Sequence, residues 1–156
     1  MRFKLLCVGK TTDLHLLALI EEYEKRLSRY INFERIELPA IKSGKKTAIE
    51  LIKQQEAQRI LERLKPEDHL VLLDETGKEY RSKAFAHQLN QYMLQSKDVC
   101  FVIGGAYGFD ATVYKRASAL LSLSKMTFSH QMIRLFFVEQ LYRGVSILKG
   151  LPYHHE

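Results

Sequence analysis

The sequence predicts a single α/β domain over residues 1–156, with a parallel-type sheet flanked by helices. Short apolar runs alternate with segments of helical periodicity, and no linker, repeat or low-complexity tract interrupts them. The runs His69–Asp74 and Val99–Ile103 are almost continuously apolar, as expected for central parallel strands covered on both faces. Strands separated by helices pair in parallel through right-handed crossovers.

The first half of the chain predicts two strands and two helices in alternation. Asp13 is predicted to cap the first helix, because its carboxylate can accept hydrogen bonds from free amides of the first turn. Leu16, Ile20 and Leu27 then follow helical spacing, and Pro66 stops the second helix. The predicted order is a strand at Phe3–Val8, a helix from Asp13 to about Tyr30, a strand at Phe33–Leu38, a basic loop at Ile41–Thr47 and a helix at Ala48–Leu64.

The second half predicts three strands and three helices. Thr76-Gly77-Lys78 predicts a turn after the third strand, and Ser82 is expected to cap the helix that follows. Asp110 is expected to cap a helix that runs to about Leu120. The predicted order is a strand at His69–Asp74, a helix from Ser82, a strand at Val99–Ile103, a helix from Asp110, a short strand at Leu121–Ser124 and a long helix at about Ser129–Leu148.

Composition limits the classes of function. The 24 Lys and Arg residues exceed the 18 Asp and Glu residues, so the net charge is +6, which is compatible with a polyanionic partner without requiring one. No apolar run approaches the roughly 20 residues that cross a bilayer, and no signal peptide is evident, so we expect a cytoplasmic protein. Cys7 and Cys100 lie in apolar runs without metal or redox spacing, which predicts two buried thiols and no metal site.

Three predicted strand ends indicate one ligand site, because ligands of open α/β sheets bind beyond the carboxyl ends of the strands. Gly104, Gly105 and Gly108 lack a Cβ atom, so backbone amides there can approach a ligand closely; a tight turn without a ligand is the alternative. The spacing matches neither the dinucleotide fingerprint nor the P-loop, which disfavours both classes of nucleotide-binding enzyme. The three ends are Leu72-Leu73-Asp74-Glu75, Ile103-Gly104-Gly105 and Leu123-Ser124-Lys125.

Polar groups near the last helix and at the C-terminus are candidates for chemistry. His130 lies at the entrance of that helix and Arg134 one turn later on the same predicted face; a capping or core histidine is the alternative. Tyr153 and His154 can stack on an unpaired base, although chain ends are often frayed. Without a metal-ligand cluster or a nucleophile elbow, methyl transfer from a sulfonium donor fits best, because it depends mostly on positioning.

Together these segments resemble a known family over essentially the whole chain. They are Phe101-Val102-Ile103-Gly104-Gly105 followed by Gly108, the run Leu121–His130, Glu139-Gln140-Leu141-Tyr142-Arg143 and Pro152-Tyr153-His154. They resemble the RlmH (YbeA-like) family of SPOUT-class methyltransferases. The resemblance implies S-adenosylmethionine-dependent methylation of N3 of a pseudouridine in large-subunit (23S-type) ribosomal RNA. It also implies a C-terminal trefoil knot and a homodimer whose two subunits complete the active site.

The resemblance also implies roles for particular residues. Those expected to bind S-adenosylmethionine are Leu73, Gly104, Gly105, Gly108, Leu123, Ser124, Lys125, Met126, Thr127 and Phe128. Those expected to accept the imide proton or to stabilise negative charge on the base are His130, Arg134, Tyr153 and His154. Ser129 stands where the family usually has proline, and we expect its hydroxyl to cap the last helix instead.

Two other functions remain open at this point. A non-catalytic, ribosome-associated RNA-binding module needs only the positive charge and the aromatic tail. A SPOUT methyltransferase with another RNA target would share the same cofactor pocket. Thermal stabilisation by S-adenosylmethionine separates the first alternative from both enzyme hypotheses, because a ligand that binds only the folded state raises its stability.

Overall fold

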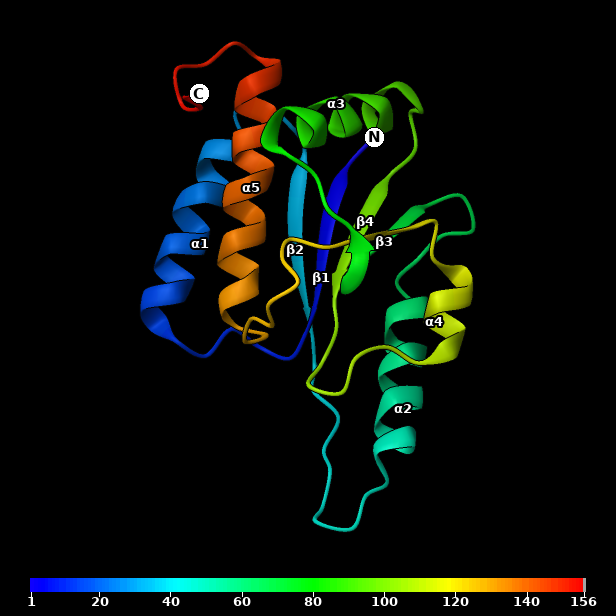
Figure 1. The fold of residues 1–156 in the computed structure, drawn as a ribbon. Coiled ribbons are helices and arrows are strands. Elements are labelled where there is room, and N and C mark those ends of the chain that lie inside the picture. Colours follow the sequence, from blue (N-terminus) through cyan, green and yellow to red (C-terminus); the bar gives the residue numbers. More distant parts are fainter. Residues whose placement is uncertain (156) are drawn as a thin grey trace.

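A five-stranded parallel sheet in the order β2-β1-β4-β3-β5 forms the centre of the fold (Figure 1). The computed structural model describes residues 1–155. Its elements are β1 (Phe3–Val8), α1 (Leu14–Leu27), β2 (Phe33–Leu38), α2 (Ile49–Leu61), β3 (His69–Lys78), α3 (Ser82–Leu94), β4 (Val99–Ile103), α4 (Ala111–Arg116), β5 (Ala119–Leu121) and α5 (Met132–Leu148). The predicted α/β class is confirmed.

Helices cover both faces of the sheet, which explains the continuously apolar strands. Because successive side chains of a strand point to opposite faces, Leu5 packs in one core cluster and Leu6 in the other. The first cluster includes buried residues of α1, α3 and α5, and the second includes buried residues of α2 and α4. Cys7 and Cys100 are buried free thiols, as predicted, and burial raises the pKa of each to about 12.

Two of the predicted helix caps are confirmed and one is wrong. The Asp13 carboxylate accepts hydrogen bonds from the amides of His15 and Leu16, and Asp110 caps α4 in the same way. Ser82 is already the first residue of α3, and the N-cap residue is Arg81, whose extended backbone ends the preceding loop. The hydroxyl therefore lies one position too late in the chain to act as the cap.

The edge formed by β3 and β5 differs from the sequence prediction. β3 continues through the predicted turn, and both Leu73 and Lys78 pair with Leu121 across an irregularity. Gly77 permits this close contact, since a Cβ atom there would lie 2.6 Å from the backbone nitrogen of Leu121. α4 ends at Arg116 and β5 ends at Leu121, so the predicted strand at Leu121–Ser124 is wrong beyond its first residue. We call residues 122–131 the β5–α5 loop.

The last helix begins at Met132 rather than at Ser129. Ser129 still caps the turn that leads into it, because its hydroxyl accepts a hydrogen bond from the Met132 amide at 3.0 Å. The carbonyl of Ser129 also accepts one from the Ile133 amide. The trefoil knot stays a prediction of the resemblance. None of the helices in residues 1–155 is long and apolar enough to span a bilayer.

Candidate functional site

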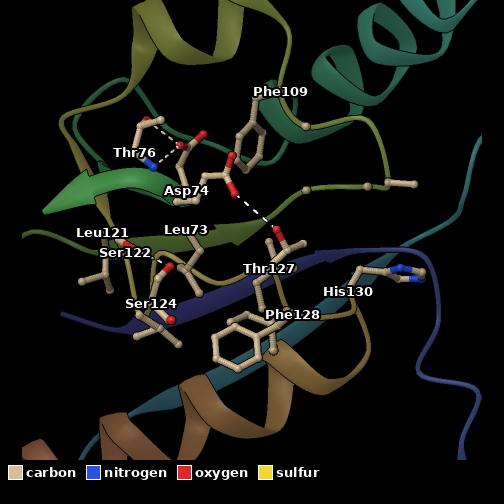
Figure 2. A pocket seen from close by; sticks show the side chains of 18 of the residues that line it. Leu73, Asp74, Thr76, Phe109, Leu121, Ser122, Ser124, Thr127, Phe128 and His130 are labelled. Atoms are coloured by element: carbon tan, nitrogen blue, oxygen red, sulfur yellow. Dashed lines mark hydrogen bonds between the residues drawn. The ribbon is translucent and has the colours of Figure 1, made fainter. Parts of the chain in front are cut away.

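A cavity of about 500 Å³ opens at the carboxyl ends of β3 and β4, beside the β5–α5 loop (Figure 2). Its walls come from the end of β3, the loop that follows β4 and the residues from Leu121 to Ile133. The three strand ends selected from the sequence therefore do converge on one space. Its volume lies in the range of small-molecule sites.

The loop after β4, residues 104–109, has a shape that depends on glycine, and we call it the glycine loop. A Cβ atom on Gly104 would lie 3.0 Å from the ring of Phe109, and one on Gly105 would lie 2.6 Å from the carboxylate of Glu56. That carboxylate, from α2, lies against Gly105, and burial raises its pKa. Gly108 has a φ of +77°, a conformation that favours glycine. The lack of a side chain at Gly104 and Gly105 therefore lets this wall of the cavity pack closely against Phe109 and Glu56.

Hydroxyl groups order the β5–α5 loop, which forms the opposite wall. Ser122 donates a hydrogen bond to the carbonyl of Ser124 at 3.0 Å, and the Ser124 hydroxyl accepts one from the Met126 amide. Thr127 donates to the Glu75 carboxylate at 3.4 Å and so joins this loop to the end of β3 (Figure 2). The serine and threonine content of this run, which a core strand would not need, therefore serves to shape a loop.

Asp74, which belongs to the strand end Leu72–Glu75 predicted to face the ligand site, lines the cavity. Asp74 accepts hydrogen bonds from the amide and hydroxyl of Thr76 at 2.8 and 2.6 Å, and another from the hydroxyl of Tyr114. Burial raises the pKa of Asp74, but these hydrogen bonds lower it more, so the group remains ionised. Burial and the neighbouring carboxylate raise the pKa of Tyr114 to about 12. In the sequence Asp74 directly follows an apolar run, and in the structure it lies within β3.

A family model described as "Predicted SPOUT methyltransferase" matches residues 1–154. The chain belongs to the SPOUT methyltransferase family. Proteins named "Ribosomal RNA large subunit methyltransferase H" are similar to it over their whole length. One from Flavobacterium johnsoniae is 49% identical over 157 residues, covering 100% of both chains, and one from Phocaeicola vulgatus is 48% identical with the same coverage.

One solved structure has a similar fold. It is a methyltransferase from Legionella pneumophila in complex with the bound cofactor SAM, with a TM-score of 0.51 and 12% sequence identity. The match covers 95% of this chain and 66% of the other, so this chain spans about two thirds of that protein. At this identity the likeness concerns the fold alone.

Most of the residues predicted to bind the cofactor line the cavity of this SPOUT protein. They are Leu73, Gly104, Gly105, Gly108, Leu123, Ser124, Met126, Thr127 and Phe128. Lys125 is exposed and does not line the cavity. Among residues 1–155, no group of three or more His, Cys, Asp and Glu side chains is arranged to hold a metal ion.

His130 and Arg134 occupy different environments. His130 is exposed at the edge of the cavity (Figure 2). The Arg134 side chain is fully buried and directed toward the end of β1. Its guanidinium donates hydrogen bonds of 2.9 Å to the carbonyls of His130 and Val8 and to the hydroxyl of Thr11.

Tyr153 and His154 lie at the opposite end of α5 from the cavity (Figure 1). The Tyr153 hydroxyl donates to the Glu139 carboxylate at 2.8 Å, and Arg143 forms an ion pair of 2.7 Å with the same carboxylate. The Tyr153 hydroxyl also lies 3.1 Å from that of Tyr23. The tail of this SPOUT protein is therefore packed rather than frayed. A helix of 17 residues is about 25 Å long, so Tyr153 and His154 are remote from the cavity of their own chain.

Proposed function

We propose that this protein transfers a methyl group from S-adenosylmethionine to N3 of a pseudouridine in large-subunit ribosomal RNA, in the cytoplasm. Membership of the SPOUT family, together with relatives named as ribosomal RNA methyltransferases that match from end to end, supports this activity. The observation that carries the proposal is the cavity formed by the end of β3, the glycine loop and the β5–α5 loop. All the residues expected to bind the cofactor, except Lys125, line this cavity.

The cavity suits a cofactor that has both an apolar ring and a charged amino-acid end. Leu73 and Phe128 supply apolar surface, while the glycine loop and the β5–α5 loop present backbone amides and carbonyls. When bound, S-adenosylmethionine supplies a methyl group that is already activated by its sulfonium. The residues of the chain then need to hold the cofactor, exclude water and orient the acceptor nitrogen.

His130 is the proposed proton acceptor for the imide nitrogen, because it is the imidazole at the edge of the cavity. Arg134 has a positioning role in this proposal. Its hydrogen bond to the His130 carbonyl and its bond to Val8 tie the start of α5 to the end of β1. Gln131 strengthens the same junction through hydrogen bonds with Lys10 and Thr12.

Tyr153 and His154 are proposed to act on the cavity of a partner subunit in a homodimer. The length of α5 supports this arrangement, since it separates the tail from the cavity of the same chain. Large apolar side chains near the cavity and at the start of α5 also remain exposed, as expected for a surface that another subunit covers. They are Met126, Phe128, Met132 and Phe136, each at least 36% exposed.

Methylation of ribosomes tests the proposed function. Assembled ribosomes and naked ribosomal RNA are incubated with the protein and S-adenosylmethionine, and the methylated base is mapped by mass spectrometry. One new methyl group at N3 of a pseudouridine is expected. Methylation of a different base would instead favour a SPOUT enzyme with another target. No transfer, together with no thermal stabilisation by S-adenosylmethionine, would favour an RNA-binding module.

A further inference from the structure

A lysine-rich segment extends beyond the carboxyl end of the sheet. Residues Ile41–Thr47 connect β2 to α2 and project past the other loops (cyan in Figure 1). The three lysines of this segment, Lys42, Lys45 and Lys46, are exposed. We call Ile41–Thr47 the lysine loop. It follows a strand parallel to β3 and β4, so it emerges at the same end of the sheet as the cavity.

Groups other than the lysines hold the lysine loop in place. The amide of Gly44 donates to the hydroxyl of Thr47 at 2.9 Å, and the Thr47 amide donates to the Gly44 carbonyl at 3.0 Å. At the base of the loop, Arg59 of α2 donates to the carbonyls of Pro39 and Ala40. The three ammonium groups are therefore available to a ligand, and their removal leaves these contacts intact.

The positive charge of the lysine loop has no internal counterion. Within residues 1–155, Lys42, Lys45 and Lys46 form no ion pair. Carboxylates at the same end of the sheet are already engaged. Glu37 accepts hydrogen bonds from Thr11 and Arg35, and the carboxylates that cap α1 and α4 are bonded to backbone amides.

Helix α2 connects the lysine loop to the wall of the cavity. The helix starts at Ile49, shortly after the loop, and its Glu56 lies against Gly105, which lines the cavity. Seven residues of helix separate these two points, which is about 10 Å. A nucleic-acid strand with one base in the cavity is thus within reach of the loop through its neighbouring phosphates.

We propose that the lysine loop binds phosphates of the RNA strand that flanks the modified nucleotide. The inference rests on the proposed function and names a surface that recognises its substrate. Lysine ammonium groups act as flexible point charges, so they suit phosphates whose positions vary and carry no sequence information. Each phosphate neutralised releases counterions, and binding should weaken with salt accordingly.

The test removes three charges at each end of the sheet in turn. One variant combines Lys42→Gln, Lys45→Gln and Lys46→Gln. The control combines Lys25→Gln, Lys65→Gln and Lys97→Gln, which are exposed lysines at the amino end, so both variants have the same net charge. The KM for unmethylated ribosomes, kcat and the affinity for S-adenosylhomocysteine are measured for wild type and both variants between 50 and about 200 mM salt.

The lysine-loop variant is expected to raise the KM for ribosomes about tenfold at the lower salt concentration and to reduce the logarithmic salt slope by about 2. Its kcat and its affinity for S-adenosylhomocysteine should equal those of wild type, and the control should match wild type throughout. An unchanged KM and slope, or an equal loss in the control, overturns the inference. Failure of wild type itself to methylate ribosomes would instead overturn the proposed function.

Discussion

The two ends of the parallel sheet use charge in opposite ways. At the amino end, Lys4 is almost buried and lies 3.0 Å from Asp98 and 3.6 Å from Asp68, so its charge is neutralised within the fold. At the carboxyl end, the strands continue into glycine-rich and hydroxyl-rich loops that surround a cavity. The charges of the lysine loop form no ion pair with any residue of the described range 1–155. The amino end thus contributes stability, while the carboxyl end is free to bind ligands.

The C-terminal tail lies at the amino end of the sheet (Figure 1) but is proposed to act in catalysis. Its deletion is expected to have the largest effect on methyl transfer. Deleting residues 151–156 should abolish turnover and leave affinity for S-adenosylmethionine unchanged. Gly104→Leu should abolish that affinity, because a side chain there collides with the ring of Phe109 and displaces the loop that lines the cavity. Mixing the two inactive variants should restore about a quarter of wild-type activity, because half of the dimers then contain one complete site. Methyl transfer to ribosomes after subunit exchange measures this.

Two outcomes of the mixing experiment would contradict the composite site. If the tail-deleted protein alone retains turnover, the tail has no part in catalysis. If subunits exchange, as native mass spectrometry can verify, and activity is still absent, the tail does not act on the partner's cavity.

At the carboxyl end, Arg134 is proposed to position the start of α5 and His130 to accept a proton. Separate substitutions of the two residues should distinguish an effect on stability from an effect on catalysis. Arg134→Lys is expected to lower the free energy of unfolding by about 3 kcal/mol, because one ammonium group cannot reach all the oxygens that the buried guanidinium contacts. His130→Asn should leave that free energy within about 0.5 kcal/mol of wild type, but lower kcat about 100-fold. Urea denaturation and a pH profile of kcat measure the two effects; a stable, fully active Arg134→Lys would remove the positioning role.

Substitutions at the amino end of the sheet should change the free energy of unfolding and leave catalysis unchanged. Lys4→Met removes the ammonium group shared by Asp98 and Asp68, which then keep only their contacts with Arg2 and with the Lys65 amide. It is expected to lower the free energy of unfolding by about 2 kcal/mol at pH 7, with turnover per folded molecule unchanged. Lys97→Met, an exposed lysine at the same end, is the control and should have no effect. A loss of kcat in the Lys4 variant would contradict the view that the amino end contributes to stability alone.

The difference in unfolding free energy between wild type and Lys4→Met should depend on pH in a defined direction. Burial raises the pKa of Asp98, but the hydrogen bonds from Lys4 and Arg2 lower it more, so its stabilisation is complete above about pH 4 and is lost as the pH falls further. Burial lowers the pKa of Lys4, but the carboxylates raise it more, so its contribution is lost only as the pH rises beyond about 10. The stability difference between wild type and Lys4→Met should therefore be constant from about pH 5 to 9 and shrink below pH 4.

The sequence could predict features that depend on local pattern. Continuous apolar runs identified the central strands, and Asp13 and Asp110 identified two helix starts, because capping involves only neighbouring amides. The extension of β3 could not be predicted, since it depends on how closely Gly77 approaches Leu121 across the sheet.

Within the site, the same limit applies. The strand-end glycines and the hydroxyl-rich run mark the cavity walls, because chain order fixes which loops meet at one edge of a parallel sheet. The direction of the Arg134 side chain was not predictable, because it is set by contacts with Val8 and Thr11, more than 120 residues earlier. The packing of the tail against Glu139 and Tyr23 is likewise a tertiary contact.

Amide hydrogen exchange with and without S-adenosylhomocysteine tests most directly that the carboxyl end is the ligand-binding end. We expect the ligand to slow exchange in the glycine loop at 104–109 and in the β5–α5 loop at 122–131. Exchange at the amino end, in residues 65–69 and 96–100, should not change. Protection confined to the amino end, or no protection anywhere at saturating ligand, would contradict the account.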